Sequence, residues 1–186
     1  PAHPANALQL ALFNETLELL ASRGVKPSIV HAANSAAALA HHSARFDMVR
    51  VGIATYGLQP GPGVADLCRG LIPAMSLKAR VSALRWIKPG DAVSYGLRRP
   101  VAEETLIATV PIGYADGVPR RLSETDVPVL LNGVPRRLAG TVTMDQIMLD
   151  CGRDSSVGLG DEVVLLGRQG EHTVTADQWA AALGTI

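Results

Sequence analysis

The sequence predicts an α/β segment followed by a mainly β domain. Three observations lead to this fold class: residues 28–53 read as strand, loop, helix and strand, a Pro- and Gly-rich stretch follows Leu58, and short strands separated by turn signals begin near Met75. Apolar strands that alternate with helices across short loops are typical of a parallel sheet or barrel with helices outside it. We therefore expect two domains, residues 1–71 and residues 72–186.

The first domain opens on a predicted helix over residues 6–22, which Gly24 and Pro27 bring to an end. Apolar residues form two overlapping stripes on this helix, so we expect it to be covered on much of its surface. Two short buried strands are predicted at residues 28–31 and 48–53, with a small Ala-rich helix over residues 36–42 between them.

Polar residues and a glycine stand where these elements end. Asn34 and Ser35 fall at a helix N-terminus, where free backbone N–H groups and the helix dipole favour an anion. Gly52 closes the next strand, and its lack of a side chain lets a ligand approach the backbone. Arg50 would project into a barrel beside that anion, where a charge needs a partner. The alternative is an ordinary cap, an edge arginine and a bulge glycine.

The second domain is expected to be built from short strands. Strands are predicted over residues 77–83, 105–112, 127–131 and 162–166. Asn132-Gly133 is a strong hairpin dipeptide. A short helix begins near Thr175, because Thr175 and Gln178 have the spacing of a capping box.

Composition and charge exclude several functional classes. Hydrophobic residues make up 47% of the chain and charged residues 18%, and 17 basic residues balance 17 acidic ones without a basic stripe. Neither nucleic acid nor a membrane is therefore an expected partner. No signal peptide pattern opens the chain. Cys68 and Cys151 are isolated and the histidines lack ligand spacing, so we expect no metal site and a cytoplasmic location.

Three motifs in the second domain carry candidate functional side chains. Tyr95 lies in Val-Ser-Tyr-Gly, Tyr114 lies in Gly-Tyr-Ala-Asp-Gly ahead of Arg120, and Met144-Asp145 lies in Gly-Thr-Val-Thr-Met-Asp-Gln. Each also has a purely structural interpretation: a packing tyrosine, a turn and a buried methionine.

The whole pattern resembles the alanine racemase family. The resemblance is carried by His-Ala-Ala-Asn-Ser ending at Ser35, by Met-Val-Arg-Val-Gly-Ile ending at Ile53, and by the three motifs above. It implies the remnant of a (β/α)8 barrel followed by a barrel-like β domain, with pyridoxal 5'-phosphate as the cofactor. By matching position, Ser35 and the backbone of Gly52 and Ile53 would hold the cofactor phosphate, and Arg50 would donate to the pyridine nitrogen. His31 would orient that loop or be a core histidine.

The resemblance also assigns roles in the second domain. Tyr95 matches the family's tyrosine base, which faces a lysine across the substrate α-carbon. Tyrosine ionises only near about pH 10 in water, so such a base requires neighbours that stabilise the phenolate. The backbone at Met144 would bind the substrate carboxylate, and Tyr114, Arg120 and Asp145 would line the corridor to the site. Many family members carry Arg where this chain has Thr141, and the loss of that Arg would change the charge of the corridor.

The resemblance implies interconversion of L- and D-alanine, which supplies D-alanine for peptidoglycan, by a homodimer whose active sites are shared between subunits. Lys26, Lys78 and Lys88 match no Schiff-base motif, and a helper histidine would fall just before Pro1. We therefore expect a fragment that is inactive by itself. The alternatives are a non-catalytic β-domain piece that acts only in association, or a racemase of broader amino-acid scope.

Overall fold

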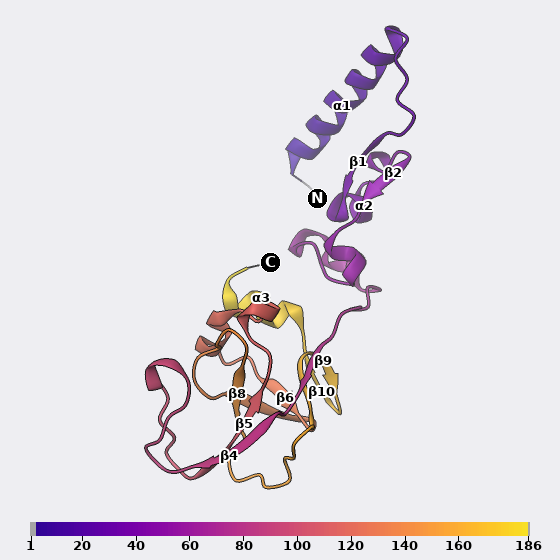
Figure 1. Cartoon of the computed structure of the whole chain (residues 1–186). Coiled ribbons are helices and arrows are strands. Elements are labelled where there is room, and N and C mark those ends of the chain that lie inside the picture. The colour runs from indigo at the N-terminus through magenta and orange to yellow at the C-terminus, as the bar shows by residue number, and fades with distance from the viewer. Residues whose placement is uncertain (1–2, 186) are drawn as a thin grey trace. The chain divides into compact units, whose positions relative to one another are not determined.

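The computed structural model describes residues 3–185. It divides into two compact units, Pro1–Ala74 and Met75–Ile186, where the sequence placed a boundary after residue 71. Figure 1 colours the first unit indigo to magenta and the second magenta to yellow. Among residues 3–185, none of the helices combines the length and apolar character needed to span a membrane.

The first unit is built around two parallel strands, β1 and β2, with short helices after each. Its elements are α1 (Pro4–Ser22), β1 (His31–Asn34), α2 (Ser35–Ala40), η1 (His42–Ala44), β2 (Met48–Arg50), η2 (Ile53–Tyr56) and η3 (Pro62–Cys68). The order strand, helix, strand is as predicted, but β1 begins three residues late. The reason is that Val30 bonds to Asp47 through its N–H and its carbonyl, and the ladder starts only where His31 lies opposite Met48.

Helix α1 differs from the prediction in its exposure. None of its residues is buried, and Leu8, Leu12 and Leu19 are each more than half exposed. Phe13 packs edge-on against Phe46, with ring centroids 5.3 Å apart. The other elements of this unit are two short strands and four short helices, and they bury no residue of α1. The expected coverage is therefore not found among the described residues of this unit.

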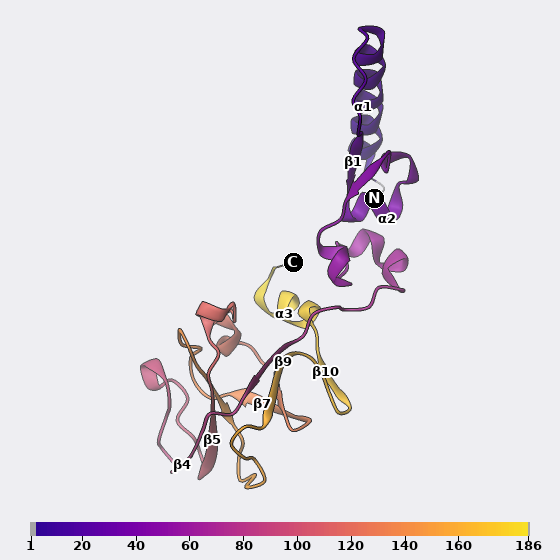
Figure 2. The ribbon, with the colours of Figure 1, turned by 45° about the vertical axis from the view of Figure 1, so that its right-hand side comes forward.

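The second unit is a curled antiparallel sheet, which Figure 2 shows turned by 45° from the view of Figure 1. Its strands are β3 (Leu77–Arg80), β4 (Ala83–Ile87), β5 (Thr105–Val110), β6 (Val129–Leu131), β7 (Val134–Leu138), β8 (Ile147–Asp150), β9 (Glu162–Gln169) and β10 (His172–Val174). They are ordered β10-β9-β6-β7-β8-β5-β4, and β3 pairs with β9. Because β3 and β4 follow one another directly, this one segment bridges β9 and β5 and closes the sheet. The predicted combination of an α/β part and a barrel-like β part is confirmed.

The core of the second unit lies inside this curled sheet. Strands β5, β6 and β9 are buried along consecutive residues, and strand β8 and the helix η6 (Arg120–Glu124) also contribute. The largest fully buried side chains are Leu122, Leu130, Leu131, Ile147, Leu149 and Leu165. Burial of each such leucine stabilises the fold by about 1.5–3 kcal/mol. Helix α3 (Ala176–Leu183) packs against η6 and contributes buried Trp179.

Two predicted local signals are confirmed in this unit. Asn132 and Gly133 both have positive φ, 52° and 77°, and join β6 to β7 as a tight hairpin. Thr175 and Gln178 form the capping box at the start of α3.

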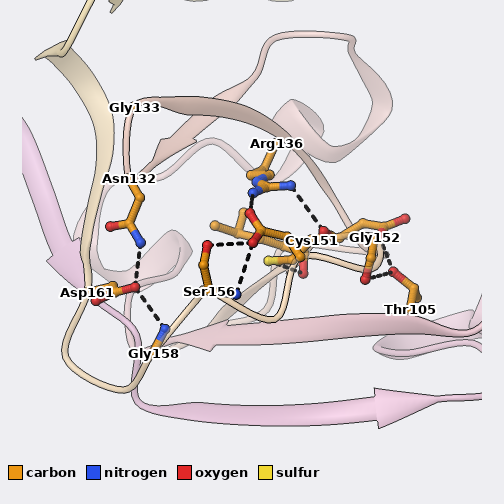
Figure 3. Close-up of polar contacts among 12 residues, drawn as sticks. Thr105, Asn132, Gly133, Arg136, Cys151, Gly152, Ser156, Gly158 and Asp161 are labelled. Atoms are coloured by element: carbon orange, nitrogen blue, oxygen red, sulfur yellow. Dashed lines mark hydrogen bonds and ion pairs between the residues drawn. The ribbon is translucent and has the colours of Figure 1, made fainter.

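A polar network fixes the long loop between β8 and β9 (Figure 3). Arg136 of β7 donates to the carbonyl of Cys151 at 3.0 Å and pairs with Asp154. Hydrogen bonds from Ser156, together with Arg136, lower the pKa of Asp154. Asp161 accepts hydrogen bonds from Gly158 and Asn132, which lower its pKa in turn. The loop is therefore anchored at both ends by ionised carboxylates.

Candidate functional site

In the first unit, the hydroxyl of Ser35 lies beside the backbone that follows β2. Ser35 is 7% exposed, and its Oγ accepts hydrogen bonds from the N–H of Gly52 at 2.9 Å and of Ala54 at 3.5 Å. A Cβ on Gly52 would lie 4.0 Å from this Oγ. The Gly52 and Ala54 N–H groups thus fix the oxygen of Ser35, and the hydroxyl hydrogen is what Ser35 itself offers an anion such as a phosphate.

The partner that a charge at Arg50 needs is His31. Arg50 Nη1 lies 2.6 Å from His31 Nδ1, and Arg50 Nη2 donates to the carbonyl of Ala32 at 3.3 Å. A guanidinium can only donate, so Nδ1 must accept and the imidazole carries its proton on Nε2. His31 is exposed in this chain, so it is not a core histidine of this unit. Its contact with Arg50 was missed, because the sequence separates the two residues and gives no sign of their pairing.

These groups lie at one edge of the strand pair. β1 and β2 run parallel with Asn34 opposite Arg50, so Ser35 and Gly52 both follow the carboxyl ends of their strands. The Ser35 hydroxyl, the Gly52–Ile53 backbone and the Arg50 guanidinium are all hydrogen-bond donors. This donor set fits a cofactor that carries a phosphate and a ring nitrogen acceptor.

In the second unit, the loops that carry the three motifs are bonded together. Tyr114 N–H donates to the Thr143 carbonyl and Ala115 N–H to the Met144 carbonyl, both at 3.0 Å. A Cβ on Gly113 would lie 2.3 Å from each of those carbonyl oxygens. Glycine is thus required for this close approach, and the Tyr114 and Met144 motifs form one rigid group.

The Tyr95 motif joins the same loop from its other end. Ser94 Oγ donates to the Thr141 carbonyl at 2.6 Å, and Thr141 Oγ1 donates to the Tyr95 carbonyl at 3.2 Å. Ser94 has φ 68° and ψ 179°, a region that is almost exclusive to glycine and costs other residues on the order of 1–3 kcal/mol. No signal in the sequence reveals this strain.

The candidate side chains of these loops are accessible. Tyr95 is 72% exposed, Met144 52% and Tyr114 43%. Asp145 is exposed next to Met144, and Arg120 is exposed at the first position of η6. Large side chains with such exposure on loops held by a rigid sheet are available to contact a ligand or another chain.

Comparison with known proteins accounts for both units. The family model described as "Alanine racemase, N-terminal domain" matches residues 1–60, and that described as "Alanine racemase, C-terminal domain" matches residues 74–186. An alanine racemase of Symbiobacterium thermophilum is 47% identical over the whole chain, which covers 49% of that protein.

Solved structures agree. An alanine racemase from D-cycloserine producing Streptomyces lavendulae superposes with a TM-score of 0.86 at 42% identity, covering 100% of this chain and 48% of that one. One from Bacillus anthracis, with bound L-Ala-P, gives a TM-score of 0.85 at 42% identity, covering 96% and 45%.

Both units therefore match consecutive domains of one class of isomerase, the amino-acid racemases. The chain belongs to the alanine racemase family. It spans about half the length of the curated relatives that it matches.

Proposed function

We propose that the protein containing this chain interconverts L- and D-alanine with pyridoxal 5'-phosphate and thereby supplies D-alanine for peptidoglycan. The observation that carries this proposal is that Tyr95, Tyr114 and Met144 stand on loops bonded to one another, within a chain that matches alanine racemases over its whole length. Residues 1–71 would belong to the cofactor-binding barrel and residues 72–186 to the β domain that completes the site.

The first unit would hold the cofactor. The Ser35 hydroxyl and the backbone of Gly52 and Ile53 bind its phosphate, and Arg50 donates to its pyridine nitrogen. When bound, pyridoxal phosphate delocalises the electron pair that remains after the α-proton of alanine is removed. Arg50 is held by His31 and cannot accept a proton, so it leaves the ring nitrogen unprotonated.

Tyr95 would act as one of two bases. In one direction the Tyr95 phenolate would remove the α-proton and the lysine of the family would deliver a proton to the opposite face. In the other direction the lysine would remove the proton and the Tyr95 hydroxyl would deliver one, so the centre is inverted either way. The backbone at Met144 binds the substrate carboxylate. Tyr114, Arg120 and Asp145 line the corridor through which alanine arrives.

The assembly would be a cytoplasmic homodimer in which Tyr95, Tyr114 and Met144 serve the active site of the partner's barrel. Their exposure on this chain supports that arrangement, because a tyrosine that is 72% exposed has room for a substrate and a second subunit.

The test is Tyr95→Phe in the full-length protein. Loss of a general base typically costs about 10²–10⁴-fold in rate, so D-alanine formation should fall by that factor while cofactor absorbance is retained. Tyr56→Phe, an exposed tyrosine of η2, is the matched control and should keep full activity. Unchanged turnover in Tyr95→Phe would sink the assignment. Racemisation of serine or lysine at a rate equal to that of alanine would instead show a broader substrate scope.

A further inference from the structure

The backbone on both sides of Tyr95 adopts conformations that side chains disfavour. Ser94 has φ 68° and ψ 179°, and Leu97 has φ 41°. Between them only Gly96, with φ 80°, adopts such a conformation without steric cost. Strained residues persist only where their surroundings hold them, so the Tyr95 segment needs external support.

Thr141 supplies that support through two hydrogen bonds of opposite direction. Its carbonyl accepts from Ser94 Oγ at 2.6 Å, and its own Oγ1 donates to the carbonyl of Tyr95 at 3.2 Å. The preceding Gly140 lets the two segments touch, since a Cβ there would lie 2.5 Å from the Val93 carbonyl oxygen. Thr141 thus holds the side chain of Ser94, immediately before Tyr95, and the backbone carbonyl immediately after the Tyr95 Cα.

We propose that Thr141 is a positioning residue that aims the Tyr95 hydroxyl at the reacting α-carbon by holding the Ser94 side chain and the Tyr95 carbonyl. This inference rests on the proposed function, because only there does the direction of Tyr95 matter. The Tyr95 side chain is 72% exposed, so little packing within this chain orients it. The direction of its Cα–Cβ bond is set by the backbone that Thr141 holds.

The side chain of Thr141 is suited to this task. Thr141 is half-buried, and a β-branched side chain has few rotamers, so its hydroxyl stays directed at the Tyr95 carbonyl. Proton transfer requires a donor–acceptor separation of about 2.6–3.2 Å. A displacement of about 1 Å can cost about a hundredfold in rate, so a small rotation of this backbone is sufficient to slow the reaction.

The test compares Thr141→Val, which removes the hydroxyl at nearly constant shape, with Thr141→Ser, which retains it. Thr173→Val, at an exposed position of strand β10, is the matched control. In the complete racemase, Thr141→Val should lower kcat about tenfold to a hundredfold with KM and cofactor affinity nearly unchanged. Thr141→Ser should recover kcat to within about threefold of the original, and Thr173→Val should match the original protein.

A second measurement is independent of catalysis. Hydrogen–deuterium exchange of the segment 93–97 should be faster in Thr141→Val than in Thr141→Ser or Thr173→Val. Ser94→Ala loses the hydroxyl and retains the strain, whereas Ser94→Gly loses the hydroxyl and relieves the strain. Ser94→Gly should therefore keep more activity than Ser94→Ala, the reverse of the usual effect of glycine in regular structure.

The outcomes separate this inference from the proposed function. If the original protein racemises alanine and Tyr95→Phe does not, but Thr141→Val keeps full kcat, the positioning role is refuted and the function stands. If exchange of residues 93–97 is equal in all variants, the support of this segment by Thr141 is refuted. If the original protein does not racemise alanine, the proposed function fails and the positioning role fails with it.

Discussion

Gly113→Ala is expected to weaken the second unit through one contact. The new Cβ would lie 2.3 Å from the carbonyl oxygens of Thr143 and Met144, and an ordinary contact of about 3.4 Å requires a shift of about 1 Å. That shift breaks the 3.0 Å bonds that Tyr114 and Ala115 donate to the same oxygens. At about 0.5–1.5 kcal/mol each, the two bonds amount to about 1–3 kcal/mol of unfolding free energy.

Gly158→Ala is the matched control. A Cβ on Gly158 meets the Asp161 carboxylate at 3.7–3.9 Å, an ordinary contact, and neither Gly158 nor Gly113 has positive φ. Alanine restricts the unfolded chain equally in both variants, which stabilises by about 0.4–1 kcal/mol. The control should therefore be slightly stabilised. Because this gain is common to both variants, they should differ by the loss of the two hydrogen bonds, about 1–3 kcal/mol.

Urea unfolding followed by tryptophan fluorescence provides the assay. Both tryptophans, Trp86 and Trp179, lie in the second unit, so the signal reports that unit alone. Equal midpoints for Gly113→Ala and Gly158→Ala would refute the claim that the two loops are in obligatory contact.

Three further predictions concern charge and thiols. The pKa of Asp154 lies below its ordinary value, so the ionised carboxylate stabilises the fold. This contribution is fully present above the unfolded pKa of about 3.9 and is lost as pH falls through the folded pKa. Asp154→Asn should therefore lower the urea midpoint at neutral pH but not in strong acid. In the complete racemase, Arg50→Lys should weaken pyridoxal phosphate binding about tenfold, the worth of one charge-assisted hydrogen bond of about 1.5 kcal/mol. The reason is that an ammonium on a flexible stem lacks the rigid planar fork that bonds His31 and the Ala32 carbonyl and fixes the direction of the remaining N–H groups. An absorbance titration with the cofactor measures this change. Burial raises the pKa of Cys151, so a thiol reagent should label half-buried Cys68 in the native chain and reach Cys151 only after unfolding.

Local signals predicted local structure well. The Asn132-Gly133 hairpin and the Thr175 capping box need only neighbouring residues, and both are found as expected. Strand β1 was placed three residues early, because its start depends on Asp47, which lies 17 positions from Val30. The exposure of α1 could not be predicted from the sequence either. An apolar stripe indicates which face a helix can bury, but it does not indicate whether another element is present to cover that face.

The candidate site divides in the same way. Sequence motifs predicted Ser35, Arg50 and Tyr95 as site residues, and these assignments remain predictions. The contacts that give the motifs their geometry, between His31 and Arg50 and between Thr141 and Tyr95, join residues 19 and 46 positions apart. Such pairs follow from strand register and loop approach, and the sequence of a single chain does not express either one.

The segment that holds β3 and β4 closes the β sheet. This closure limits when the unit can fold during synthesis. Leu77, at the start of the unit, lies opposite Leu166 of β9, so nearly the whole unit must be synthesised before its first strand finds a partner. Contacts of such long sequence separation delay folding, because loop-closure entropy is lost before the pairing is gained. During synthesis the edge of β3 stays open, and a ribosome-bound chain that ends before Glu162 would depend on chaperones to keep that edge from pairing with other chains.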